Sequence, residues 1–211
     1  MTTLSPSLPE LAERILSTPL RTRRRLIALA GAPASGKSTL ADQLADQLRD
    51  QGQTAQVVPM DGFHLHNRTL ADRGWLNRKG AAHTFDSMGF LSLVRRLPDE
   101  EEVFYPDFDR ARDIAIAAAG RIGPDCETVI IEGNYLLFDA PIWRDLAPLW
   151  DLSLRLDIPM DVLETRLIQR WLDHGLSKDK AIARANQNDL VNARAIQDAP
   201  LPADITIRAT P

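Results

Sequence analysis

The chain has 211 residues, of which 44% are hydrophobic and 26% are charged, and its formal net charge is −4. This composition predicts one folded domain over residues 1–211 and excludes wholesale disorder, while the acidic balance argues against a nucleic-acid binder with a basic face. The single cysteine, Cys126, cannot form an internal disulfide, no apolar run approaches the roughly 18 residues of a membrane span, and the acid-containing N-terminal stretch is unlike a signal peptide. We therefore expect a cytoplasmic protein that binds neither nucleic acid nor membrane.

The first half of the chain alternates between helical and strand-like patterns. Apolar residues at helical spacing predict helices over 8–18, 38–50 and 87–97, and short apolar runs predict strands over 26–30 and 54–60. The basic run over residues 21–25 is interpreted as a solvated turn before the first strand. Residues 62–86 are polar and contain three glycines, and a loop of this length is typical of a lid or a binding loop.

The same alternation continues in the second half. Two short strand-like pieces within 102–119 surround a polar segment at 106–113, and further strands are predicted over 128–131, 152–158 and 205–207. Helical patterns cover residues 161–174 and 177–199. Strands separated by helices predict an α/β fold, with a mainly parallel sheet that is covered by helices on both faces.

Residues 31–38 read Gly-Ala-Pro-Ala-Ser-Gly-Lys-Ser and match G-x-x-x-x-G-K-[ST], the pattern of a phosphate-binding loop (P-loop). Gly31 and Gly36 let the backbone curl, so that successive N–H groups point at phosphate oxygens. Lys37 adds a positive charge over the β- and γ-phosphates, and Ser38 supplies a hydroxyl for Mg²⁺. We therefore predict a three-layer P-loop NTPase fold, in which ATP is bound by Gly31, Ala32, Pro33, Ala34, Ser35, Gly36, Lys37, Ser38 and Thr39.

The motif does not say what becomes of the nucleotide. The chain contains neither the Asn-Lys-x-Asp element of a GTPase nor the Leu-Ser-Gly-Gly element of an ABC-type ATPase, which leaves a small-molecule kinase as the common alternative. Such an enzyme needs an acceptor pocket, a base and a cationic lid. Asp61 follows the second predicted strand, at the edge where open α/β sheets bind ligands. From the residues alone, Asp61 is equally a base or a turn aspartate before Gly62.

Three further segments carry a family resemblance. Residues 59–67 (Pro-Met-Asp-Gly-Phe-His-Leu-His-Asn), 78–80 (Arg-Lys-Gly) and 85–86 (Phe-Asp) resemble the uridine kinase, pantothenate kinase and phosphoribulokinase superfamily of P-loop kinases. The likeness runs from about residue 24 onward and is greatest to bacterial proteins described as fructose-transport-system kinase-like or nucleoside/nucleotide kinase-like. It implies that Asp61 is the base that takes the proton of the acceptor hydroxyl.

The resemblance also implies a magnesium site. Glu132 ends the predicted strand 128–131 and resembles the carboxylate of the family's Ile-Glu-Gly element, which serves Mg²⁺. Ser38 and Glu132 are therefore the expected metal ligands, with Asp61 left open as a third, because Mg²⁺ prefers hydroxyl, carboxylate and phosphate oxygens. The alternative is that Glu132 only faces solvent at the end of its strand.

The acceptor is expected between residues 61–86 and 104–113. His64 stands where uridine kinases place an aromatic side chain, and Tyr105 belongs to a stretch that resembles the family's Tyr-Asp-Phe segment. Arg78 and Arg110 are candidates for binding an anionic group. His83 departs from uridine kinases, which carry a ribose-binding carboxylate near this position, so a sugar such as fructose is favoured. Pantothenate-like and nucleoside acceptors stay open.

A helical lid is predicted over roughly 161–190. Arg166 and Arg170 share one face of a helix and repel each other, and a bound triphosphate would offset that repulsion. The resemblance implies that they contact the phosphates, with Arg170 as the catalytic cation; the alternative is a solvated salt bridge between Arg170 and Asp173. Asn188 and Asn192 also share a helical face. We expect a core or interface position for the aromatic residues Trp143, Trp150 and Trp171.

The expected activity is an ATP- and Mg²⁺-dependent transfer of the γ-phosphoryl group to a hydroxyl of a small metabolite. Two other classes stay open. One is a regulatory NTPase that needs no acceptor, and the other is a nucleotide-binding module without chemistry. A homodimer is compatible with the sequence, although no feature indicates one.

Overall fold

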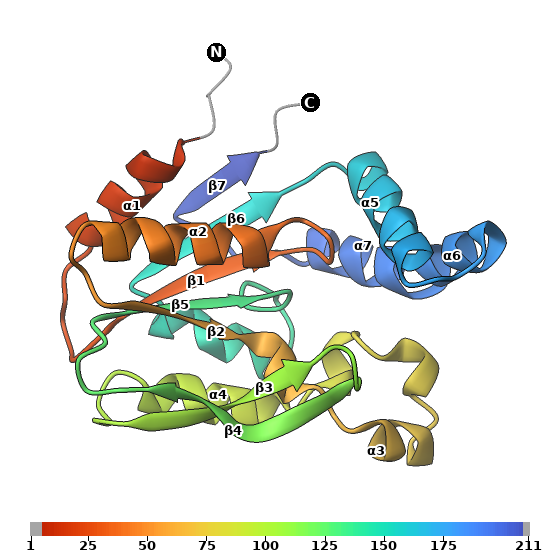
Figure 1. Cartoon of the computed structure of the whole chain (residues 1–211), viewed down its shortest axis with the longest axis horizontal. Helices are drawn as coiled ribbons and strands as arrows, with labels where there is room; N and C mark the ends of the chain where they lie inside the picture. Colours follow the sequence, from red (N-terminus) through yellow and green to blue (C-terminus); the bar gives the residue numbers. More distant parts are fainter. Residues whose placement is uncertain (1–5, 209–211) are drawn as a thin grey trace.

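Five strands form a parallel sheet in the order β2–β5–β1–β6–β7 (Figure 1). The computed structural model describes residues 6–208; residues 1–5 and 209–211, which belong to the predicted domain 1–211, lie outside the described residues. The strands are β1 (Arg25–Gly31), β2 (Ala55–Pro59), β5 (Thr128–Gly133), β6 (Leu152–Asp157) and β7 (Ile205–Arg208). The α/β fold with a mainly parallel sheet is thereby confirmed.

Helices cover both faces of this sheet and give it three layers. The helices α1 (Leu8–Ser17) and α2 (Lys37–Asp50) pack on one face. The helix α4 (Ser87–Arg96) and the 3₁₀ helix Trp143–Leu149 pack on the other. Alternate residues of β1 point to the two layers: Ile27 and Leu29 belong to the first core, and Leu26, Ala28 and Ala30 belong to the second. Burial on both faces explains the continuous apolar run in the sequence.

A separate antiparallel hairpin packs beside the sheet. It consists of β3 (Val103–Asp109) and β4 (Ile114–Ile122), and β3 continues through the first half of the predicted polar segment 106–113. The connection is therefore only residues 110–113. The hairpin lies against the 3₁₀ turn Met60–Phe63, where a Cβ on Gly62 would stand 1.9 Å from the carbonyl oxygen of Pro106. Glycine is required there because the two backbones touch, and this contact brings the hairpin next to Asp61.

The predicted loop 62–86 is partly helical. It contains α3 (Asn67–Asp72) and the short 3₁₀ helices Leu76–Arg78 and Ala82–Thr84. Short helices of this kind bury too few residues to show a periodic apolar pattern, which is why the sequence read as a loop.

The C-terminal helices stand at the carboxyl edge of the sheet, on the right of Figure 1. They are α5 (Met160–Asp173), α6 (Lys178–Arg184) and α7 (Leu190–Asp198). The sequence predicted one helix over 177–199, whereas the structure has a π-helical turn, Ala185–Asp189, between α6 and α7. Turns of this type are frequent at functional sites. No helix within residues 6–208 is long and apolar enough to cross a membrane.

The basic run before β1 is not uniformly solvated, which corrects the sequence interpretation. Arg21 and Arg23 are exposed, but Arg24 is fully buried. Its guanidinium donates hydrogen bonds to the backbone carbonyl oxygens of Leu97, Glu100, Glu101 and Gly123. The charge is tolerated in the interior because these carbonyls, left over at the ends of neighbouring elements, replace its hydration.

Candidate active site

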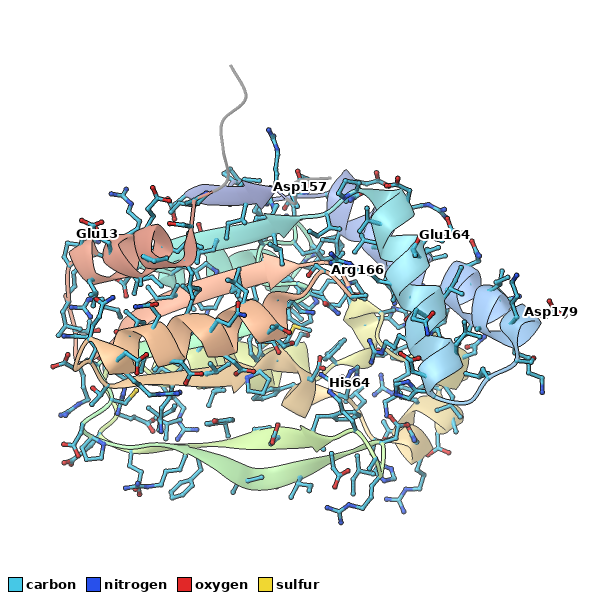
Figure 2. All side chains as sticks on the ribbon, turned by 45° about the horizontal axis from the view of Figure 1, so that its top comes forward. Glu13, His64, Asp157, Glu164, Arg166 and Asp179 are labelled. Carbon is cyan, nitrogen blue, oxygen red and sulfur yellow. The ribbon has the colours of Figure 1, made fainter. Side chains whose placement is uncertain are left out.

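The predicted P-loop turns from the end of β1 into the first residue of α2. Gly36 has a φ of +96° and Ala34 a φ of +61°, so the backbone turns through the left-handed region at two points. Arg166 on α5 donates to the carbonyl oxygens of Ala34 (3.4 Å) and Ser35 (3.1 Å), and Figure 2 shows it reaching from α5 toward this turn. An alanine in the left-handed region persists only when its surroundings hold it, and Arg166 is one such restraint.

A cleft of about 490 Å³ opens at the carboxyl edge of the sheet. The P-loop and the start of α2 form one end, and the 3₁₀ turn after β2, the hairpin connection and the C-terminal helices form the rest. It is lined by Pro33, Ala34, Gly36, Lys37, Ser38, Thr39, Asp61, His64, Lys79, Gly80, Phe108, Arg110, Asp113, Asn134, Arg170, Trp171, His174, Arg184, Asp189 and Asn192.

The predicted metal ligands lie together at the floor of the cleft. Ser38 Oγ donates to Glu132 Oε1 at 3.1 Å, and Lys37 Nζ lies 4.0 Å from Glu132 Oε2. Burial raises the pKa of Glu132, and Lys37 offsets part of that effect. Glu132 Oε2 is buried without a hydrogen-bond partner. A hydroxyl beside an unsatisfied carboxylate oxygen fits Mg²⁺, which is usually held by one or two protein oxygens together with phosphates and water.

Asp61 faces the same cleft from the 3₁₀ turn after β2. Its Oδ2 accepts a hydrogen bond of 2.7 Å from Arg110 Nη2, and its Oδ1 lies 4.0 Å from His64 Nε2. Burial raises the pKa of Asp61, but attraction to Lys37, His64 and Arg110 outweighs burial and holds it below the ordinary value. Asp61 is therefore ionised at neutral pH.

His64 is an uncharged neighbour of this carboxylate. Its ring stacks on Phe85 at 4.0 Å, and Figure 2 shows the side chain beside the β3–β4 hairpin. Burial lowers the pKa of His64 to about 4, although the nearby Asp61 acts in the opposite direction. At neutral pH the contact between His64 and Asp61 is thus polar and not an ion pair.

A second polar cluster lies where residues 67–80 meet the hairpin connection 110–113. We call this the acceptor side of the cleft, because the sequence predicts that the acceptor binds between residues 61–86 and 104–113. Lys79 Nζ contacts Asp113 Oδ1 at 2.8 Å, the carbonyl oxygen of Asp113 at 3.0 Å and Asn67 Oδ1 at 2.7 Å. The ammonium group also lies 5.0 Å from the centre of the Phe108 ring. Lys79 therefore ties the segment after α3 to the connection of the hairpin.

The lid side of the cleft is built around Trp171. Its Nε1 donates to Asp189 Oδ2 at 2.6 Å, and the guanidinium groups of Arg170 and Arg184 lie 5.9 Å and 5.2 Å from its ring. Trp171 packs against the hydrophobic cluster of the C-terminal helices, in line with the expected core position, but it also lines the cleft. Trp143 is buried as predicted. Asp173 accepts from Gln169, the residue before Arg170, and not from Arg170 itself.

The two asparagines of the C-terminal helices contact the acceptor-side segment directly. Asn188 Nδ2 donates to the carbonyl oxygen of Lys79 at 2.9 Å. Arg78 donates to Asn192 Oδ1 at 3.0 Å and to the carbonyl oxygen of Gln187 at 2.9 Å. These bonds join residues 78–80 to the π turn and the start of α7. We call this set of hydrogen bonds the Arg78 latch.

Three predicted acceptor residues do not line the cleft. Arg78 is engaged in the latch. His83 is exposed and packs against the ring of Trp75 at 4.9 Å. Tyr105 is half-buried, and its hydroxyl donates to the carbonyl oxygen of Val57 at 3.2 Å. His64 and Arg110 do line the cleft, as do Lys37, Asp61 and Arg170.

Several cleft residues were not predicted from the sequence to be functional, namely Lys79, Phe108, Asp113, Asn134, Trp171, His174, Arg184 and Asp189. Two of them could have been found from the sequence, because Lys79 lies in the Arg-Lys-Gly run and Phe108 in the Tyr105–Arg110 segment, and both segments carry the family resemblance. Asp189 could not, because its placement depends on the π turn.

Known proteins resemble the chain over most of its length. Residues 26–188 match the Phosphoribulokinase / Uridine kinase family. A Schizosaccharomyces pombe protein named "Putative uridine kinase C227.14" is 34% identical over 96% of this chain and 90% of its own. The crystal structure of a "putative fructose transport system kinase" from Silicibacter sp. TM1040 is 60% identical over 95% of this chain and 98% of its own, with a TM-score of 0.93. YFH7 from Saccharomyces cerevisiae, 21% identical over 98% of this chain and 100% of its own, shares the fold with a TM-score of 0.82.

Proposed function

The chain belongs to the phosphoribulokinase/uridine kinase family of ATP-dependent P-loop kinases, and we propose that it phosphorylates a hydroxyl of a small sugar or sugar derivative of the fructose type. One observation carries this proposal. Lys37 of the P-loop and the Asp61 carboxylate line the same cleft, although they come from different strand ends. A phosphate-binding loop that faces an ionised carboxylate across a cavity is the arrangement that phosphoryl transfer to an alcohol requires.

The P-loop end of the cleft is proposed to hold the nucleotide. The backbone N–H groups of Gly36, Lys37 and Ser38, at the N-terminus of α2, are proposed to contact the phosphates, and Lys37 neutralises charge on the β- and γ-phosphates. Ser38 and Glu132 would hold the metal. Mg²⁺, when bound, offsets the charge that develops on the phosphate oxygens.

Asp61 is the proposed general base. The acceptor oxygen forms a bond to the γ-phosphorus as the bond from that phosphorus to the β–γ bridging oxygen breaks, and ADP leaves. Asp61 takes the hydroxyl proton, which its ionised state at neutral pH permits. Arg170, from the proposed lid over roughly residues 161–190, lines the cleft and supplies positive charge beside the transferred group.

The acceptor class rests on two weaker supports. The Silicibacter protein with 60% identity is described as a "putative fructose transport system kinase". His83 replaces the carboxylate expected near this position for ribose binding, and it is exposed in this structure. Both favour a sugar over a nucleoside.

A panel of acceptors tests the proposal. We expect ADP to form in the presence of ATP, Mg²⁺ and a sugar-type acceptor, and to form far more slowly with pantothenate or uridine. Chelation of Mg²⁺ should stop the reaction, and Glu132→Gln should raise the Mg²⁺ concentration needed for half-maximal rate. If ATP turnover is the same with and without every acceptor, the protein is a hydrolase and the kinase assignment fails.

A further inference from the structure

The contact between Arg110 and Asp61 has a consequence for the acceptor. We propose that the acceptor carries an anionic group, a phosphate or a carboxylate, which draws the Arg110 guanidinium away from Asp61 and frees this carboxylate to act as base. The inference rests on the proposed function and deepens it. It names the substrate class, and it assigns Arg110 two roles, one in masking the base and one in binding the acceptor.

The starting point is the ion pair itself. Arg110 lies on the hairpin connection and Asp61 on the turn after β2, and Nη2 and Oδ2 are 2.7 Å apart. The two side chains differ in exposure, at 57% for Arg110 and 20% for Asp61. The carboxylate is therefore fixed near the floor of the cleft, while the guanidinium reaches it from the solvent side and is free to turn outward.

This pair stands where the acceptor hydroxyl has to bind. A general base needs an oxygen within hydrogen-bond distance of the hydroxyl proton. Oδ2 of Asp61 accepts the hydrogen bond from Arg110, and Oδ1 lies 4.0 Å from His64 Nε2. The exposed guanidinium therefore covers Oδ2 on the solvent side, and it has to move before the hydroxyl can approach this oxygen from the open side of the cleft.

The other cations on the acceptor side are already committed. The ammonium group of Lys79 has three oxygen partners, two on Asp113 and one on Asn67, which matches its three N–H donors. His64 is uncharged at neutral pH because burial lowers its pKa to about 4. Among the cations that line the cleft within residues 6–208, Arg110 is the one hydrogen-bonded to the proposed base, so exchange of this partner for a ligand is what frees Asp61.

The nature of the ligand follows from this exchange. Once Arg110 leaves Asp61, its planar fork of N–H donors suits a carboxylate or a phosphate, which can accept two parallel hydrogen bonds. A neutral acceptor offers no such replacement, so Arg110 tends to return to Asp61. An anionic acceptor therefore replaces the Asp61 carboxylate as the partner of the guanidinium and, in the same step, exposes Asp61 to the hydroxyl.

The two proposed roles of Arg110 should be visible in the rate of ATP hydrolysis without an acceptor and in kcat/KM for anionic and neutral acceptors. Masking by a half-exposed ion pair is weak, so its removal should raise acceptor-independent ATP hydrolysis by roughly two- to five-fold. Recognition of the anionic group uses charge-assisted hydrogen bonds, so it should favour anionic over neutral acceptors in kcat/KM by roughly 10- to 100-fold.

The experiment compares the full-length wild type, Arg110→Gln and Arg112→Gln. Arg112 is a matched control, because it lies on the same connection, is exposed, and pairs at 2.7 Å with Asp109 instead of Asp61. Each variant is assayed with acceptors in neutral and anionic pairs: fructose with its 1- and 6-phosphates, glycerol with glycerate, and pantothenol with pantothenate. Hydrolysis without an acceptor is measured in parallel, also for the double variant Asp61→Asn, Arg110→Gln.

We expect the wild type and Arg112→Gln to prefer the anionic member of a pair, and Arg110→Gln to lose that preference. Arg110→Gln should also hydrolyse ATP faster without an acceptor, and the double variant should not. A wild type that uses the neutral member as well as the anionic one overturns the inference but leaves the kinase function intact. If no acceptor in the panel is used, the hydrolysis rates decide, and an unchanged rate in Arg110→Gln overturns it. Full acceptor-dependent activity in the single variant Asp61→Asn, assayed with the same acceptors, would instead reject the proposed function.

Discussion

The two ends of the cleft are built in different ways. The phosphate end consists of consecutive residues, Gly31 to Thr39, whose turn and helix start are fixed by local sequence and held in part by Arg166. The acceptor end combines the turn after β2, residues 67–80, the hairpin connection and the π turn, which are joined by side chains up to 114 residues apart in the chain. On the proposed function, phosphate recognition is therefore mainly local and made by the backbone, whereas acceptor recognition is long-range and made by side chains.

This difference predicts how each end responds to mutation. A substitution at the phosphate end should affect every reaction of the nucleotide, with or without an acceptor. A substitution at the acceptor end should separate ATP binding from phosphoryl transfer. The following predictions test that separation, beginning with the largest effect.

Lys37→Ala should reduce ATP turnover with any acceptor by on the order of 10³-fold or more, because a buried cation next to the transferred group is lost. ATP affinity should fall as well, which calorimetric titration would measure. Lys79→Ala, which removes a cleft lysine of the acceptor end, serves as the control and should leave ATP affinity near the wild-type value. Wild-type turnover in Lys37→Ala would show that the P-loop does not hold the nucleotide.

Asp61→Asn should lower kcat by roughly 10²–10⁴-fold, the scale of a lost general base, while ATP affinity changes little. The amide keeps the size of the side chain and the hydrogen-bonding oxygen but cannot take a proton. Asp113→Asn, the other carboxylate variant on this side of the cleft, should affect kcat less, since Asp113 holds Lys79 in place. An unchanged kcat in Asp61→Asn would make Asp61 a turn residue only.

His64 should make folding stability depend on pH. Its pKa is about 4 in the folded protein and about 6.5 ordinarily, so the unfolded chain binds more protons between these values. Its contribution to stability is therefore present above pH 6.5 and is lost as the pH falls toward 4, by up to roughly 3 kcal/mol. Urea unfolding at several pH values should show a shallower dependence for His64→Gln than for the wild type. His83→Gln, which changes an exposed histidine, should retain most of the wild-type slope; equal slopes in all three proteins would contradict this account.

Loss of the Arg78 latch should have the smallest effect. Arg78→Gln removes charge-assisted bonds to Gln187 and Asn192, and we expect kcat/KM for the acceptor to fall about five-fold, as for partly exposed hydrogen bonds from a charged donor to neutral acceptors. Affinity for ATP alone should stay near the wild-type value. Arg73→Gln is the control, since Arg73 is exposed in the same segment and contacts only the face of Trp75 among the contacts described for it. Equal losses in both variants would mean that the latch does not position the acceptor segment.

The fold shows the same difference between local and long-range features: elements with a local pattern could be predicted, and those held by distant contacts could not. The strands and long helices could be predicted because burial on one or both faces leaves a periodic or continuous apolar pattern, as in β1 and α2. The burial of Arg24 could not be predicted, since nothing in a run of arginines shows that one of them donates to four backbone carbonyl oxygens. The π turn at 185–189 also leaves no local pattern, because tertiary contacts of Asn188 and Asp189 hold it.

The site shows the same limit. Positions at strand ends were informative, since parallel strands bring their carboxyl ends to one edge. Asp61 lines the cleft, and Glu132 near the end of β5 contacts Ser38, which also lines it. The partner of Asp61 could not be read from the sequence, because Arg110 reaches it from a hairpin whose approach depends on the close contact at Gly62. Arg78 was placed at the acceptor by its position in a motif, but its hydrogen bonds go to the C-terminal helices.

The most direct test of the central claim is a crystal structure with Mg²⁺ and a non-hydrolysable ATP analogue, in which the position of the γ-phosphate relative to Asp61 is measured. We predict that the P-loop binds the phosphates, that Ser38 and Glu132 face the metal, and that a water or hydroxyl in line with the γ-phosphorus lies within roughly 2.6–3.2 Å of the Asp61 carboxylate. A γ-phosphate that points away from Asp61, with other protein groups filling the space between them, would contradict the account.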